Sequence, residues 1–156
     1  MSKMIAIIVT AIVVLGTSFA QAKAKTCLIS KSGEATIKSL TTGKTEKART
    51  VAATLEDATT ENGELVPERL AIKAKSKTMR YSTIAIRFDD MEPGTYVVEC
   101  DGGTAKLTHS ANGYTLNSES LYGAIKGNTG CGGEEPDSEG IIVLKNLILE
   151  EKACAK

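Results

Sequence analysis

The residues best suited to chemistry lie together in one stretch of the chain. Residues 96–109 read YVVECDGGTAKLTH and hold Cys100, a glycine-rich turn and His109, the single histidine of the sequence. A thiolate beside an imidazole is a nucleophile with its base, and both side chains are metal ligands. No second histidine or neighbouring cysteine completes a metal site, so we expect both residues to be parts of a core. A small hydrolase that pairs His109 with Asp101 or Glu92 is the alternative.

The glycines of this stretch predict a three-stranded meander. Turns at Gly102-Gly103 and Asn112-Gly113 would join its strands, because these residues tolerate a positive φ. The first turn places inward-facing residues opposite each other: Cys100 with Ala105, Val98 with Leu107, and Tyr96 with His109. The second turn keeps the same face and pairs Ala111 with Tyr114 and His109 with Leu116. The spacing therefore predicts that Cys100 and His109 lie inside the fold.

Two acidic clusters are the other candidates for a site. Asp89 and Asp90 stand together ahead of a Pro-Gly turn, a pattern more typical of solvated turns than of a glycosidase carboxylate pair. The loop 121–140 is rich in glycine and carboxylates but lacks the alternate spacing of a calcium loop. We expect no catalytic residue, no metal and no cofactor, and a partner-binding surface on this loop. Its candidate binding residues are Tyr122, Glu134, Glu135, Asp137 and Glu139.

Alternating apolar and polar residues predict antiparallel strands along most of the chain. Residues 27–30 and 36–40 are expected to form a first hairpin about the turn Lys31-Ser32-Gly33. Residues 70–75 and 84–88 are expected to form a second hairpin, with one apolar and one basic face. The apolar face would carry Leu70, Ile72, Ala74, Ile84, Ile86 and Phe88. Asn62-Gly63 is a further hairpin signal.

Two segments fit a strand or a helix. Residues 48–55 have neighbours that are strands and a high threonine content, which favour a strand. Residues 141–149 are nearly all apolar and suit a strand buried on both faces, although their second half could also make a short helix.

The N-terminus has the pattern of a cleavable export signal in residues 1–22. Lys3 precedes an apolar run over residues 4–15, and Ala20-Gln21-Ala22 fits a signal-peptidase site, as does cleavage after Ala24. The run is shorter than the roughly 20 residues that a membrane helix needs. We therefore expect residues 23–156 to form one β-rich domain that is periplasmic or extracellular, with no membrane insertion after cleavage.

The cysteine content agrees with export to an oxidising compartment. The chain has four cysteines, Cys27, Cys100, Cys131 and Cys154, and no C-x-x-C spacing. These features predict two structural disulfides rather than a redox pair or a metal site. We favour Cys27 with Cys100 and Cys131 with Cys154, although the sequence leaves the other connectivities open.

Charge and local resemblances complete the prediction. The 19 basic and 19 acidic residues balance, which argues against a nucleic-acid partner. Residues 93–98, PGTYVV, resemble the start of a late strand in carboxypeptidase-regulatory, transthyretin-like and other immunoglobulin-like sandwiches. Residues 96–103 and 118–122 resemble segments of the periplasmic inhibitors of c-type lysozyme, and this implies an inhibitor of a host hydrolase as an alternative function.

The sequence thus predicts an all-β protein, an antiparallel β-sandwich that is immunoglobulin-like or transthyretin-like in general architecture. We expect it to act as a non-catalytic binding or cell-envelope structural protein with a protein or envelope partner.

Overall fold

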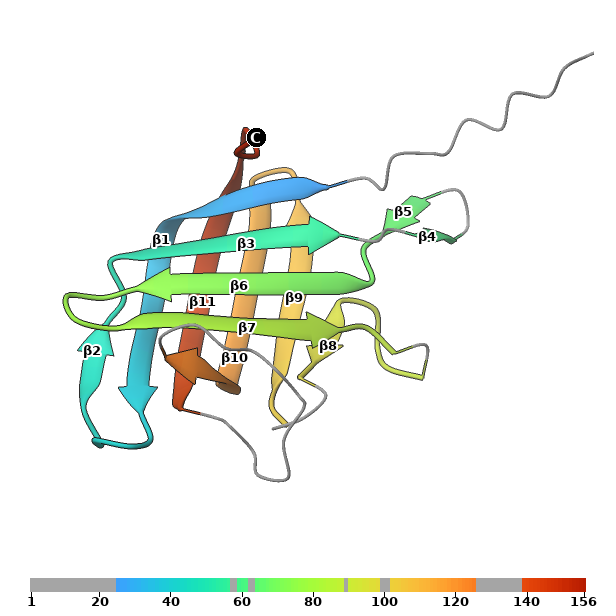
Figure 1. Cartoon of the computed structure of the whole chain (residues 1–156). Helices are drawn as coiled ribbons and strands as arrows, with labels where there is room; N and C mark the ends of the chain where they lie inside the picture. Colours follow the sequence, from blue (N-terminus) through green and yellow to red (C-terminus); the bar gives the residue numbers. More distant parts are fainter. Residues whose placement is uncertain (1–24, 57–58, 62–63, 89, 99–101, 126–138) are drawn as a thin grey trace, which may run out of the picture.

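The computed structural model describes residues 25–56, 59–61, 64–88, 90–98, 102–125 and 139–156 (Figure 1). All regular elements of these residues are β-strands. They are β1 (Thr26–Ser39), β2 (Thr45–Lys47), β3 (Thr50–Glu56), β4 (Thr59–Glu61), β5 (Glu64–Val66), β6 (Arg69–Lys75), β7 (Arg80–Ile86), β8 (Thr95–Val97), β9 (Thr104–Ser110), β10 (Gly113–Ile125) and β11 (Gly140–Lys152). The predicted export signal lies outside the described residues. None of the residues described belongs to a helix long and apolar enough to cross a membrane.

The strands close into an eight-stranded antiparallel barrel. The order around it is β1-β3-β6-β7-β8-β9-β10-β11, and β11 pairs with β1 to complete the ring. Strand β2 lies beside the second half of β1, and β4 and β5 form a separate small hairpin in which Glu61 pairs with Glu64. The prediction of an all-β fold is confirmed, but the β-sandwich is wrong, because the pairing of β1 with β11 closes the main sheet on itself instead of leaving two sheets packed face to face.

The barrel can close because β1 is a single bent strand and not the predicted hairpin. Its first half pairs with β3, its second half with β2, and β11 pairs along almost its full length (Figure 1). The predicted turn at Lys31-Ser32-Gly33 is a bulge in this strand, with register shifts between Ser30 and Glu34. A bulge bends a strand and raises its twist, so one strand serves two walls of the barrel.

Gly33 and Asn146 meet at this bend. Gly33 has φ 102°, and a Cβ at Gly33 would overlap the carbonyl oxygen of Asn146 on β11. Asn146 is itself left-handed, with φ 46°, and its backbone N–H donates to Oδ1 of Asn117 on β10 at 2.7 Å. The close approach of two backbones therefore requires a glycine at position 33.

The barrel interior is filled by alternate residues of every long strand. Residues 48–55 lie largely in β3, which confirms the strand, and Val51, Ala53 and Leu55 face inward. Strand β11 is also confirmed, but it is buried on one face only. Ile142, Leu144, Leu147 and Leu149 are buried, while Ile141 and Val143 are half-buried on the outside. Lys145 and Asn146 are two consecutive exposed residues between the buried Leu144 and Leu147, and the alternation of buried and outward residues resumes at Leu147.

The β6–β7 hairpin is confirmed, but β7 presents the opposite face to the one predicted. Tyr81, Thr83 and Ala85 point inward, and Ile84 and Ile86 lie half-buried on the outside. Phe88, also predicted on the apolar face, is 42% exposed. The Tyr81 hydroxyl donates to the carbonyl of Leu121 at 2.6 Å inside the barrel, which fixes this orientation.

The meander of β8, β9 and β10 keeps the predicted face with a different register. Tyr96 pairs with Ala105, not with His109, and Leu107 pairs with Leu116. The two-residue turn is Ala111-Asn112, since Ser110 pairs with Gly113. Both register changes are even, so the inward residues stay inward. His109, however, falls beyond the core at the end of β9 and is exposed, contrary to the prediction.

A disulfide staples the seam of the barrel. Cys27 at the start of β1 is bonded to Cys154, just after β11, with Cα atoms 5.3 Å apart and a sequence separation of 127. The favoured pairings of Cys27 with Cys100 and of Cys131 with Cys154 are therefore both wrong. The pairing partners could not be chosen from spacing because they depend on which strands meet at closure. Cys100 and Cys131 lie outside the described residues.

Candidate functional site

The predicted loop site is only partly described, and its described residues have structural contacts. Glu134, Glu135 and Asp137 lie outside the described residues. The Glu139 carboxylate accepts from the backbone N–H of Ile125 at 3.1 Å. Its own N–H donates to the carbonyl of Gly123, which joins the start of β11 to the end of β10. Tyr122 is half-buried on β10, and its carbonyl accepts from the Thr83 hydroxyl at 2.7 Å.

The candidate hydrolase residues are not brought together. His109 stacks on Tyr114 with ring centroids 4.3 Å apart. Glu92 forms an ion pair with Lys106 at 2.9 Å, and the hydrogen bond from this ammonium lowers the pKa of Glu92. Asp101 is outside the described residues. In the parts of the chain that the structure covers, no three His, Cys, Asp or Glu side chains gather as metal ligands would.

A groove of about 1180 Å³ runs over the outside of β3, β6 and β7. These three strands lie side by side across the front of the barrel in Figure 1, and β9, β10 and β11 cross behind them. We call this hollow the basic groove and define it by its outward side chains. They are the aliphatic floor Ile29, Ala52, Ala71 and Ile84 and the cationic rim Arg69, Lys73, Lys75, Arg80 and Lys152.

The floor crosses four strands diagonally, because Ala52 pairs with Lys73 and Ala71 pairs with Thr54 in the β3–β6 ladder. Ile29 on β1 pairs with Ala52 on β3, and Ala71 on β6 pairs with Ile84 on β7. All four side chains are half-buried although they point away from the core. Aliphatic side chains that are neither buried nor fully solvated form a surface on which an apolar group gains contact.

The rim carries an excess of positive charge, although Glu56 lies opposite Arg69 in the β3–β6 ladder. Lys75 and Arg80 lie directly opposite each other in the β6–β7 ladder, and Lys73 is next along the same face. None of the five rim residues forms an ion pair with a described carboxylate. Glu56, the acidic residue in the groove lining, pairs with Lys25 at 3.2 Å. Like charges directly opposite in a sheet are destabilising, so this end of the groove favours an anion.

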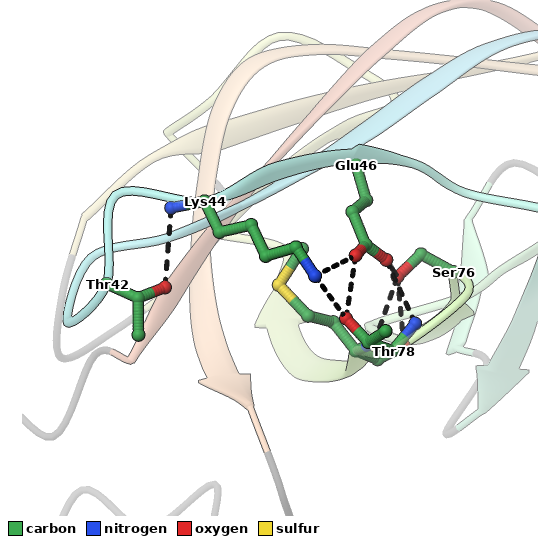
Figure 2. A network of polar contacts seen from close by, with 6 residues as sticks. Thr42, Lys44, Glu46, Ser76 and Thr78 are labelled. Atoms are coloured by element: carbon green, nitrogen blue, oxygen red, sulfur yellow. Dashed lines mark hydrogen bonds and ion pairs between the residues drawn. The ribbon is translucent and has the colours of Figure 1, made fainter.

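A polar network holds the β6–β7 turn at the cationic end (Figure 2). The Glu46 carboxylate on β2 accepts from the Ser76 hydroxyl at 2.6 Å and from the Thr78 N–H at 2.9 Å. Lys44 forms an ion pair with the same carboxylate and donates to the Thr78 hydroxyl. The hydrogen bond from Lys44, followed by those from Ser76 and Thr78, holds the pKa of Glu46 well below its usual range.

The network fixes the position of the rim through the turn. Glu46 is 13% exposed, and Ser76 and Met79 are buried at this end of the barrel. The Ser76 hydroxyl also accepts from the Met79 N–H at 3.0 Å. Residues 76–79 connect Lys75 to Arg80, so an ordered turn keeps these two cations in register.

No protein-family model, curated protein or solved structure matches this chain. The functional interpretation therefore rests on the groove and its chemistry.

The sequence contained one part of this site. The basic face of the β6–β7 hairpin was visible in the alternation of Lys73 and Lys75 with apolar residues. The floor was missed because Ile84 was assigned to the interior. The signal that could have found it is Tyr81, since the alternation from Tyr81 through Thr83 to Ala85 leaves Ile84 outside.

Proposed function

We propose that this chain is an exported, non-catalytic binding protein and that an anionic partner binds in the basic groove. The observation that carries the proposal is the set of five cations around an aliphatic floor, none of which forms an ion pair with a described carboxylate. Isolated surface cations are ordinary, but a directly opposed pair such as Lys75 and Arg80 is unfavourable without an anion between them.

Export is supported by two features of the chain. Residues 1–22 have the pattern of a signal peptide, and the Cys27–Cys154 disulfide suits an oxidising compartment. Binding outside the cytoplasm would use the groove as a fixed surface, because its three strands are joined by continuous ladders from Thr50 to Ile86.

The test is a panel of anionic probes measured against a variant without the cationic end of the rim. Dextran sulfate, vesicles of phosphatidylglycerol, a glutamate-rich peptide and dodecyl phosphate would be titrated into the wild type and into K73Q/K75Q/R80Q. The matched control is K38Q/K47Q/K145Q, which removes the same charge from exposed lysines outside the groove.

We expect at least one probe to bind saturably to the wild type and to the control. Binding should weaken by about tenfold or more in the rim variant, since each exposed contact contributes up to about 1 kcal/mol, and it should weaken with added salt. Absence of binding by every probe, or equal binding by both variants, would contradict the proposal.

A further inference from the structure

The two chemical characters of the basic groove are separated along its length. Successive outward pairs from the β6–β7 turn are Lys75 with Arg80, then Lys73 with Ser82, then Ala71 with Ile84. At about 3.3 Å per residue, this aliphatic pair lies roughly 13 Å from the charged pair, whereas Ala52 and Ile29 lie in the row of Lys73, roughly 7 Å from the row of the charged pair. A ligand that fills the groove would therefore be anionic next to the β6–β7 turn and apolar over the floor.

The floor is shaped for an aliphatic chain and offers no stacking surface. Its residues span β7, β6, β3 and β1, a width of roughly 14 Å at about 4.8 Å per strand. Tyr81 is the aromatic residue among the described lining, and it is 2% exposed with its hydroxyl bonded inside the barrel. Sugars and nucleobases bind best to exposed aromatic rings, so this floor favours an alkyl chain over both.

The rim also limits the size of the ligand. Arg69 lies beyond the floor on β6, between Ile86 on β7 and Glu56 on β3, and Lys152 borders the floor from β11. Cations on both sides of a hollow apolar strip suit one molecule lying within it. A bilayer surface is instead bound by apolar side chains that protrude.

We infer that the basic groove binds a single-chain anionic amphiphile, with its headgroup at Lys73, Lys75 and Arg80 and its alkyl chain over Ile84, Ala71, Ala52 and Ile29. This inference rests on the proposed function and specifies its ligand. Phosphate or carboxylate oxygens would accept charge-assisted hydrogen bonds from the two ammonium groups and the guanidinium. The same headgroup relieves the repulsion between Lys75 and Arg80.

The experiment is calorimetric titration of the wild type with three probes below their micellar concentrations. Dodecyl phosphate carries head and tail, inorganic phosphate carries the head alone, and dodecyl maltoside carries the tail with a neutral head. We expect one molecule of dodecyl phosphate to bind per chain, with affinity at least about tenfold above either partial probe.

Two variants on β7 test the floor. Ile84→Thr should lower the affinity for dodecyl phosphate by about three- to tenfold through lost apolar contact. Ile86→Thr is the matched control, because Ile86 is also outward and half-buried on β7 but does not line the groove, and it should bind as the wild type does. Thermal unfolding of each variant checks that the barrel is intact.

The outcomes separate this inference from the proposed function. Dextran sulfate, the acidic peptide or vesicles could bind through the rim while dodecyl phosphate binds no better than phosphate. This result would contradict the inference of an amphiphilic ligand and would support the proposal of an anionic partner. If dodecyl phosphate binds equally to the wild type, Ile84→Thr and K73Q/K75Q/R80Q, the groove is not its site. If no probe binds, both proposals fail.

Discussion

Cys27 and Cys154 are joined at the point where the first and last strands of the barrel meet, with their Cα atoms 5.3 Å apart. Cys27 pairs with Lys152 in the β1–β11 ladder, so the disulfide links two segments that are already neighbours in the closed barrel. Its contribution to stability is thus expected to come from the unfolded chain, in which it closes a long loop.

Removal of this disulfide should cost about 4 to 5 kcal/mol in the free energy of unfolding, from the loop-closure entropy of a loop of this length. The measurement is urea denaturation of C27S, C154S and the double variant against the oxidised wild type. The three variants should be about equally destabilised, because each removes the same bond. A double variant as stable as the wild type would contradict a stabilising bond between Cys27 and Cys154.

The remaining two cysteines, Cys100 and Cys131, are expected to form the second disulfide. The sequence predicts two bonds, and once Cys27 is joined to Cys154 one pairing is left. Peptide mapping without reduction should recover both linked peptide pairs. Alkylation of Cys100 and Cys131 in the unreduced, unfolded protein would show instead that these thiols are free.

Substitution of Gly33 should damage the bend of β1. An alanine there would have to hold φ near 102° and would overlap the Asn146 carbonyl, so Gly33→Ala should cost at least about 2 kcal/mol. Gly43→Ala is the control. Gly43 also has a positive φ, 70°, but no atom lies within 4 Å of its added Cβ, so about 1 kcal/mol is expected. Equal losses in urea denaturation would argue against the backbone contact.

The Glu46 network should give the barrel a pH-dependent component of stability. The pKa of Glu46 is lowered in the folded state, so its contribution is fully present above the unfolded value near 4.5 and is lost as pH falls below it. Glu46→Gln should therefore be less stable than the wild type at pH 7, and the difference should shrink as the pH falls toward 3.

The measurement is thermal unfolding of both proteins across this range. Glu34→Gln is the control, since Glu34 is exposed and has no described ion pair, and it should leave the midpoint nearly unchanged at pH 7. A constant difference between Glu46→Gln and the wild type from pH 7 to pH 3 would mean that the carboxylate charge is not the stabilising feature.

Strand positions were predictable where the two-residue alternation is strong. Leu70, Ile72 and Ala74 on β6 and Leu107 on β9 are buried as expected. The inward residues of the meander were predicted correctly up to Leu107 although its register was wrong, because an even shift in register leaves each side chain on the same face. Alternation therefore determined the inward residues more reliably than it determined their partners.

The closure and the groove depend on information that alternation does not carry. Gly33 has the positive φ that a turn requires, but a bulge requires it as well, so a hairpin and a bent strand share this signal. The face of Ile84 depends on the register set by residues 76–79 and on the bond from Tyr81 to Leu121, 40 residues away. The bend of β1 and the outward position of Ile84 both depend on tertiary contacts. The first allows the barrel to close, and the second forms the floor of the groove.

The central claim is that the outer face of β3, β6 and β7 binds an anionic amphiphile, and backbone amide chemical shifts during titration with dodecyl phosphate test it most directly. We predict saturable shifts that concentrate at Ala52, Ala71, Lys73, Lys75 and Ile84, with those of β9 nearly unchanged. Absence of saturable shifts, or shifts concentrated on β9, β10 and β11, would contradict the claim.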